Sequence, residues 1–212
     1  MKTTGFRNMC RFLLAGTLLM CAGQLAAQNA VSDLASAKAA MERKDYRTAA
    51  RMATKVYFLS GTPDEANEAL ELSIAANAAI PDADQEKNRS AELNKTTGLL
   101  LVLTGEQTIF RCFKFQCGRD FSVPSGEFLV GPKLAYPNFE LNGVLYKTGA
   151  EGNTLGSRWI ELRDADGIPA AGIHGEAPLA GEDAEQLFFR MKNSDVNELF
   201  GLLKEGSRVL VR

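Results

Sequence analysis

The spacing of hydrophobic residues divides this chain into a helical first part and a mainly β second part. Between residues 31 and 80, apolar and small side chains recur every three or four positions, clearest over 46–57 and 66–74, as they do on one face of a helix. From residue 92 onward, apolar residues instead alternate with polar ones or form short runs bounded by glycine and proline. The pattern predicts an α+β multidomain protein. A helical hairpin or three-helix segment over 31–80 would precede a mainly β domain over 92–212, with one helix near the C-terminus.

Capping residues indicate where the helices begin. The first helix is expected from near Ser32 to near Arg43, and the side chain of Asp45 is suited to cap the second. Thr62 supplies a cap for the third helix, Pro63 fits its first turn, and the glutamate three residues after the threonine would complete a capping box.

The segment 81–91 is polar and led by a proline, and it is expected to be the linker between the two parts. Beyond it, an apolar run over 98–103 and an alternating run over 108–117 predict a β-hairpin. Further short strands and one helix are expected at Glu127–Val130, Arg158–Leu162, Ala171–His174, Arg208–Arg212 and, for the helix, Asn193–Leu203.

Residues 1–27 have the pattern of a secretory signal peptide. Lys2, Arg7 and Arg11 form a basic start, the apolar run of residues 12–20 follows, and Ala27 ends a plausible cleavage site. The apolar run is too short to span a bilayer comfortably. We expect an exported protein of the periplasm or cell envelope, with no integral membrane span after removal of the signal.

Cys21 offers an alternative to cleavage after Ala27, in which a lipidated cysteine anchors the chain; the bulky Met20 before it disfavours this processing. Cleavage after residue 27 leaves 21 basic and 26 acidic residues, a formal charge of −5, which argues against a nucleic-acid partner. Cys112 and Cys117 remain, five positions apart in one predicted strand, too far apart for a mutual disulfide unless the strand folds back.

Two stretches of sequence resemble known families. Residues 40–50 resemble the helix junction of a tetratricopeptide unit, and one and a half such units cannot bury a stable core. That block is therefore expected to dock on the following domain, on a second copy or on a partner. A hairpin that only braces the second domain is the alternative.

The second part, about residues 92–212, resembles the catalytic domain of L,D-transpeptidases, which cross-link peptidoglycan. The motifs that carry the resemblance occur in the family's order: Gly118–Asp120, Pro124–Lys133, Leu155–Leu162, Gly172–Gly175, Arg190–Met191, Asn193, Asp195–Val196, Glu198–Phe200 and Gly206–Val209.

The resemblance breaks at the family's nucleophile. L,D-transpeptidases carry Ser-His-Gly-Cys, then an apolar residue and often arginine; anchored on Arg190, this chain reads Glu185, Gln186, Leu187 and Phe188 at the four positions, without a gap. Phe188 therefore occupies the position of the attacking cysteine. A phenyl ring cannot form a thioester, so covalent catalysis at that position is excluded.

The resemblance implies a degenerate L,D-transpeptidase, a pseudoenzyme that binds peptidoglycan stem peptides or an envelope protein. His174, the only histidine, matches the family's base and would be vestigial, serving in binding or as a core residue. The ligand-binding cleft would contain His174, Gly175, Gln186 and Arg190. Arg190 would hold a stem-peptide carboxylate; the alternative is that it pins neighbouring loops.

Two other functions stay open. An active transpeptidase or hydrolase would need a relocated nucleophile, such as the thiol of Cys117 or Cys112. A structural scaffold would have its cleft plugged by Phe188. No cofactor and no metal site is predicted. Asp164–Gly167 has only the start of a calcium loop and is expected to be a turn. A zinc site is not supported, because the chain has no second histidine.

Overall fold

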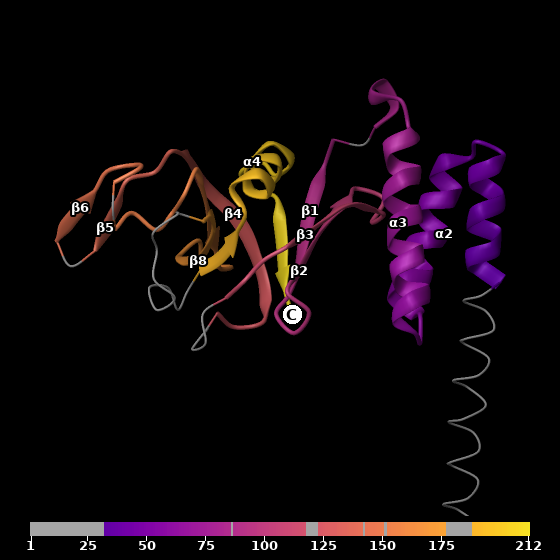
Figure 1. Ribbon diagram of the computed structural model, residues 1–212, viewed down its shortest axis with the longest axis horizontal. Helices are drawn as coiled ribbons and strands as arrows, with labels where there is room; N and C mark the ends of the chain where they lie inside the picture. Colours follow the sequence, from indigo (N-terminus) through magenta and orange to yellow (C-terminus); the bar gives the residue numbers. More distant parts are fainter. Residues whose placement is uncertain (1–31, 86, 118–122, 142, 151, 177–187) are drawn as a thin grey trace, which may run out of the picture. The chain divides into compact units, whose positions relative to one another are not determined.

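The computed structural model describes residues 32–212 except 86, 118–122, 142, 151 and 177–187. The chain divides into two compact units, Met1–Gln85 and Glu86–Arg212 (Figure 1). The first unit is helical, and the second is mainly β with one helix near the C-terminus, so the predicted α+β class is confirmed. The expected signal peptide, including Cys21, lies outside the described residues.

The first unit consists of a helix over residues 32–42, α2 (Tyr46–Leu59), α3 (Pro63–Ala79) and a short 3-10 helix, η1 (Asp82–Asp84). Small residues let the helices approach closely; the fully buried ones include Ala40, Ala49, Ala53, Ala69 and Ala76. The hydroxyls of Thr54 and Ser73 form a buried 2.7 Å hydrogen bond that joins α2 to α3.

Both predicted helix caps are confirmed. The Asp45 carboxylate accepts a hydrogen bond from Thr48 N at 3.3 Å, and the Thr62 hydroxyl accepts one from Glu65 N at 3.3 Å. The predicted capping box is wrong in its second hydrogen bond, which would run from Thr62 N to the Glu65 carboxylate. Thr62 N donates to Ser60 Oγ, and the Glu65 carboxylate accepts from the same serine hydroxyl, so the hydroxyl of Ser60 takes the place of the glutamate.

The second unit is built on an eight-stranded sheet in the order β3-β2-β1-β10-β4-β7-β8-β9, in which β1/β10 and β8/β9 pair in parallel. Its strands are β1 (Arg89–Asn94), β2 (Leu99–Thr104), β3 (Ile109–Lys114), β4 (Gly126–Ala135), β7 (Arg158–Arg163), β8 (Pro169–Gly175), β9 (Phe188–Met191) and β10 (Arg208–Val211). A separate hairpin comprises β5 (Phe139–Leu141) and β6 (Val144–Tyr146), and the helix is α4 (Asn193–Leu202).

A backbone bridge joins the two ends of this sheet order. Gln116, two residues beyond β3, donates from its backbone N to Arg190 O at 2.8 Å, and Arg190 N donates to Gln116 O at 2.9 Å. Because Arg190 lies in β9, the bridge connects the segment after one edge strand to the other edge strand. The edge strand β9 therefore gains a backbone partner at this point.

The hydrophobic core lies between one face of the sheet and α4. Inward-facing residues of β7, β8 and β9 alternate with outward-facing ones, as a half-buried sheet requires. The buried residues in this region are Ile160, Leu162, Ala171, Ile173, Phe189, Met191, Val196 and Leu199. The opposite face of the same three strands carries His174, Phe188 and Arg190 of the predicted site.

The sequence did not predict every strand. β9 has only four residues, too short for a periodic signal, and β1 begins at Arg89, inside the segment expected to be a linker. The turn predicted at Asp164–Gly167 is confirmed, since the Asp164 carboxylate accepts hydrogen bonds from Asp166 N and Ile168 N. Within the described ranges, no helix has the length and apolar character needed to cross a membrane.

Candidate functional site

The register of three neighbouring strands brings three of the predicted site residues, His174, Phe188 and Arg190, onto one face. His174 of β8 pairs with Trp159 of β7 on one side and with Arg190 of β9 on the other. Two residues earlier in β8, Gly172 pairs with Phe188. Paired residues share a face, and residues two apart in a strand do as well. These five residues therefore lie together on the face opposite the core.

Three aromatic rings pack against each other at the centre of this face. The Phe188 ring lies edge to face against the His174 imidazole, with centroids 5.8 Å apart, and against the Trp159 indole, with centroids 4.9 Å apart. The indole covers Gly172 so closely that a β-carbon there would lie 2.0 Å from Trp159 Cη2. His174 is fully buried, whereas Phe188 and Trp159 are half-buried. The phenyl ring thus occupies the space beside the imidazole.

The His174 ring is fixed by a hydrogen bond at its Nδ1 atom. This nitrogen lies 2.6 Å from the carbonyl oxygen of Gly175. A carbonyl oxygen can only accept, so Nδ1 must carry the proton that the hydrogen bond shares. In a neutral imidazole, Nε2 is then the basic nitrogen. The hydrogen bond therefore fixes the tautomer of the neutral ring, with its proton on Nδ1.

Asn193, the first residue of α4, holds the end of the strand that carries His174. Its side-chain oxygen accepts from Ser157 N at 2.9 Å, and its amide nitrogen donates to Glu176 O at 2.7 Å. Positions 175 and 156 both need glycine. A β-carbon on Gly175 would lie 2.1 Å from Asn193 Oδ1, and one on Gly156 would lie 2.6 Å from the Gly175 carbonyl carbon. Three of the motifs found in the sequence therefore meet at one junction behind the histidine.

Arg190 lies on the same face and is tied to the chain after β3. Its Nη2 atom donates to Gln116 Oε1 at 2.9 Å, beside the backbone bridge between the same two residues. This contact is of the kind expected if Arg190 pins neighbouring segments. Sequence patterns did not point to Gln116, since its role depends on the pairing of strands 74 residues apart.

Of the four predicted cleft residues, the structure places His174 and Arg190 on this face, and Gly175 next to His174 but on the other face of the strand. His174 and Gly175 are consecutive in β8, and Arg190 is the partner of His174 in β9. Gln186, the fourth, lies outside the described residues. The described ranges hold no group of three or more His, Cys, Asp or Glu side chains that could bind a metal ion.

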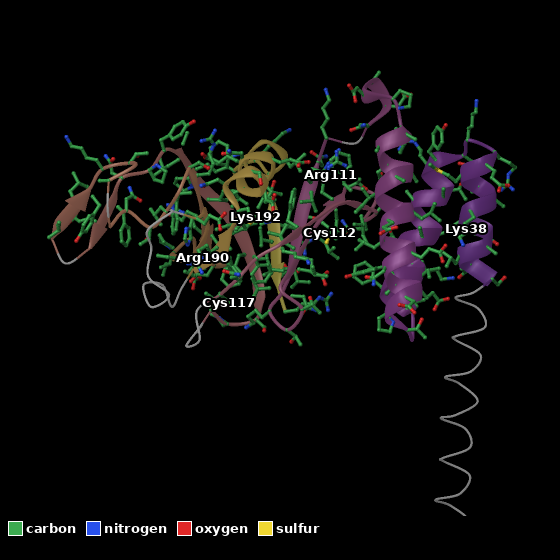
Figure 2. The ribbon with its side chains drawn as sticks, viewed as in Figure 1. Lys38, Arg111, Cys112, Cys117, Arg190 and Lys192 are labelled. Atoms are coloured by element: carbon green, nitrogen blue, oxygen red, sulfur yellow. The ribbon has the colours of Figure 1, made fainter. Side chains whose placement is uncertain are left out.

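Neither thiol of the described residues is in a position suited to catalysis with His174. Cys112 and Cys117 are free and half-buried (Figure 2). The Gln116 side chain reaches Arg190 on the outer face, so the next residue, Cys117, turns inward, where it packs against the core. Burial raises the pKa of both thiols, which lowers the fraction of reactive thiolate at neutral pH.

No protein-family model matches the chain, and no curated protein matches it. Among solved structures, the chain is similar to a variant of the Enterococcus faecium L,D-transpeptidase, with 18% identity, a TM-score of 0.44, and coverage of 60% of this chain and 50% of that one. It is also similar to an L,D-transpeptidase of Xylanimonas cellulosilytica, with 17% identity, a TM-score of 0.41, and coverage of 67% and 69%.

A third similar structure is the isolated catalytic domain of the E. faecium L,D-transpeptidase acylated by ertapenem. Here the identity is 19% and the TM-score 0.43, and the match covers 59% of this chain and 98% of that one. By contrast, this chain spans about half the length of the first solved structures it matches. The three similar structures named here are thus L,D-transpeptidases.

Proposed function

We propose that this chain is an exported, L,D-transpeptidase-like protein that has lost acyl transfer and binds peptidoglycan stem peptides on the sheet face around His174. One observation carries the proposal. The Phe188 ring, which the sequence alignment puts at the position of the catalytic cysteine, lies 5.8 Å from the only imidazole of the chain. The base is kept in its place, and the residue beside it has no nucleophilic atom.

The loss of acyl transfer is supported by the chemistry of this pair. The family's reaction needs a thiolate next to an imidazole, so that the sulfur can attack a peptide carbonyl. Phe188 supplies no sulfur. Cys117 packs into the core, and burial raises the pKa of its thiol, which weakens the case for a relocated nucleophile.

Binding is supported by the side chains around the aromatic rings. The Arg190 guanidinium is half-buried and gives one hydrogen bond to Gln116, and its remaining N–H groups suit a carboxylate. Trp159 and Phe188 together offer a half-buried aromatic surface next to that charge. A stem peptide combines a carboxylate with apolar methyl groups, so both parts of this face would contact it.

Trp159 makes the proposal directly testable, because it is the only tryptophan of the chain and lies in the site. We expect a soluble muropeptide with a tetrapeptide stem to change the fluorescence of Trp159 in a saturable way. Arg190→Ala should weaken binding about tenfold or more, the usual loss with a charge-assisted hydrogen bond. Arg111→Ala, a matched change at a half-buried arginine paired with Glu198, should bind like the wild type.

A scaffold without a peptide ligand is the second candidate, and the same Phe188 contact favours it, because the ring fills the space beside His174. In that case, the muropeptide leaves the fluorescence of Trp159 unchanged. The tetratricopeptide-like helices would then supply the binding surface for an envelope protein. Binding of an isolated envelope protein by the full chain, in the absence of muropeptide binding, would support this candidate, and saturable muropeptide binding by the full chain would contradict it.

A further inference from the structure

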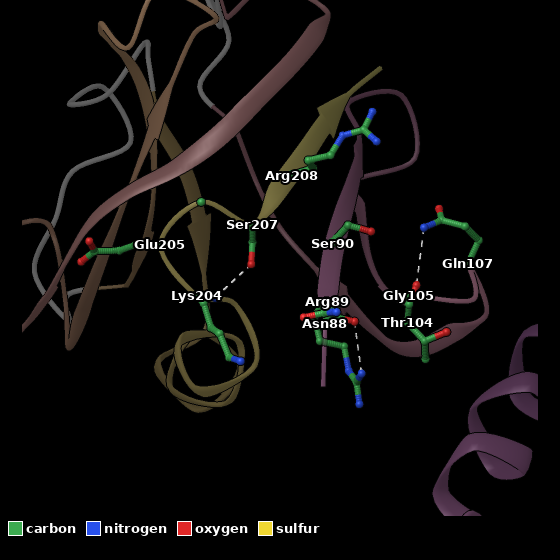
Figure 3. Close-up of a pocket in the computed structure, with 11 residues that line it drawn as sticks. Asn88, Arg89, Ser90, Thr104, Gly105, Gln107, Lys204, Glu205, Ser207 and Arg208 are labelled. Carbon is green, nitrogen blue, oxygen red and sulfur yellow. Dashed lines mark hydrogen bonds between the residues drawn. The ribbon is translucent and has the colours of Figure 1, made fainter. Parts of the chain in front are cut away.

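A second candidate site lies on the β unit, at the ends where the parallel strands β1 and β10 begin (Figure 3). A pocket of about 340 Å³ opens there between the β2–β3 turn and the turn that joins α4 to β10. Two strands, β4 and β7, separate β10 from the β8 strand of His174 in the sheet. The pocket is therefore distinct from the face proposed to bind peptide.

The lining of the pocket is entirely polar apart from two glycines. It contains three cationic side chains, those of Arg89, Lys204 and Arg208, and one carboxylate, that of Glu205. Figure 3 shows the Glu205 side chain directed away from the other labelled side chains. The lining thus carries a formal charge of +2 in a protein whose formal net charge is −2. Such a lining suits an anionic, strongly hydrated ligand rather than an apolar one.

The three cations differ in how they are held. The Arg89 guanidinium stacks over the Phe110 ring, with Cζ 4.3 Å from the centroid, which fixes its position. Arg208 is paired with the Glu127 carboxylate at 2.5 Å. The ammonium of Lys204 makes no ion pair with any residue of the described ranges, and its side chain is exposed. Lys204 is therefore the cation most available to a bound anion.

The turn that carries Lys204 also supplies a hydroxyl at a fixed position. The Ser207 hydroxyl accepts from Lys204 N at 3.0 Å, and Ser207 N donates to Lys204 O at 2.9 Å. An oxygen that accepts still has its own hydrogen to donate. Ser90, near the start of β1, adds a second hydroxyl to the pocket lining. Ammonium, guanidinium and hydroxyl groups are the donors that phosphate and carboxylate oxygens accept from.

We propose that this pocket binds the oxyanion group, phosphate or carboxylate, of a small molecule. Lys204 and Arg89 supply the charge, and Ser207 and Ser90 donate hydrogen bonds. The volume lies at the lower end of the range of small-molecule pockets, which favours a compact ligand over a polymer. The proposal does not depend on the peptide-binding function, because it uses none of the residues of the His174 face.

The test is a titration of the full chain with inorganic phosphate, and separately with citrate, at constant ionic strength, followed by amide NMR shifts. We expect saturable shifts at Ser90, Lys204, Gly206 and Ser207. Lys204→Gln should weaken binding about tenfold, which corresponds to one lost charge-assisted hydrogen bond. Lys114→Gln removes an exposed lysine of the same unit outside the pocket and should leave the affinity unchanged.

The two anions separate the possible ligand sources. Tighter binding of phosphate points to a phosphate ester, and tighter binding of citrate points to a polycarboxylate. Shifts that do not saturate with either anion would overturn the proposal, as would an affinity of the Lys204→Gln variant equal to that of the wild type. The change of Trp159 fluorescence with the muropeptide tests the peptide site separately. Failure of the anion-binding proposal can therefore be distinguished from failure of the peptide-binding proposal.

Discussion

Phe188 and His174 stand on the same outward face of adjacent parallel strands, with their rings edge to face and inclined by 84°. The contact places an inert ring beside a buried imidazole whose Nδ1 is already committed to the Gly175 carbonyl. The structure thus places a phenyl ring, which has no nucleophilic atom, directly beside this imidazole. Under the proposed function, this contact is what distinguishes the present binding site from the catalytic site of an active transpeptidase.

Returning a thiol to position 188 should restore reactivity. In Phe188→Cys, the new sulfur would lie on the half-buried outer face next to the imidazole, which favours the thiolate. We expect it to react with iodoacetamide at neutral pH about tenfold faster than either native thiol. Mass spectrometry of the labelled peptides measures the three rates. Adding His174→Asn should remove the advantage, and equal rates with and without the histidine would contradict the proposed pairing.

The native thiols should behave as buried, unreactive cysteines. Burial raises the pKa of Cys112 and of Cys117, so less thiolate is present at a given pH than in a free cysteine. Alkylation should therefore be slow at neutral pH, and its rate should still increase with pH in the range where a free cysteine already reacts at its limiting rate. Rates measured in the folded and the urea-unfolded chain test this. A folded-state rate above the unfolded one would revive the relocated-nucleophile hypothesis.

The glycine junction behind His174 should be intolerant of a single methyl group. Gly156 has φ +61°, and a β-carbon there would meet the backbone of Gly175 at 2.6 Å. We expect Gly156→Ala to lower the free energy of unfolding by about 1 kcal/mol through backbone strain and by about 2 kcal/mol more through the clash. Urea denaturation measures both effects together.

The matched control for this junction is Gly167→Ala. Gly167 has a similar left-handed conformation, φ +78°, but open space around the position of a β-carbon. For Gly167→Ala we therefore expect only the loss from backbone strain, about 1 kcal/mol in the free energy of unfolding. Equal losses of unfolding free energy in Gly156→Ala and Gly167→Ala would contradict the tight packing of Gly156 against Asn193 and Gly175.

Lys133 should matter to stability through the end of α4. Its ammonium donates to the carbonyl oxygens of Phe200 and Leu203, each at 2.5 Å, and lies 4.3 Å from the centroid of the Phe200 ring. Lys133→Met keeps much of the apolar stem but leaves two helix-end carbonyls without this donor. We expect a loss of about 1–3 kcal/mol in the free energy of unfolding. Lys114→Met, at an exposed position, should change it by less than about 0.5 kcal/mol.

Local signals were sufficient to predict the helical unit and the strands β2, β3, β7, β8 and β10, whereas no strand was predicted at the place of β1. Asp45 and Thr62 cap the helices they were expected to cap, because a cap depends on residues three positions away. The four-residue strand β9 and the Gln116 bridge to Arg190 were not predicted, because both depend on strands distant in sequence. The orientation of Phe188 toward His174 also could not be predicted, since a shift of one residue in register would have turned the ring to the core.

NMR titration of the wild-type protein with a tetrapeptide-stem muropeptide tests binding and the loss of catalysis together, because spectra of the mixture report on both protein and ligand. We expect saturable shifts at His174, Gly175 and Arg190, while the muropeptide stays chemically unchanged over days. Cleavage or cross-linking of the muropeptide by the wild type would contradict the loss of catalysis. An absence of shifts at these three residues would contradict the proposed binding.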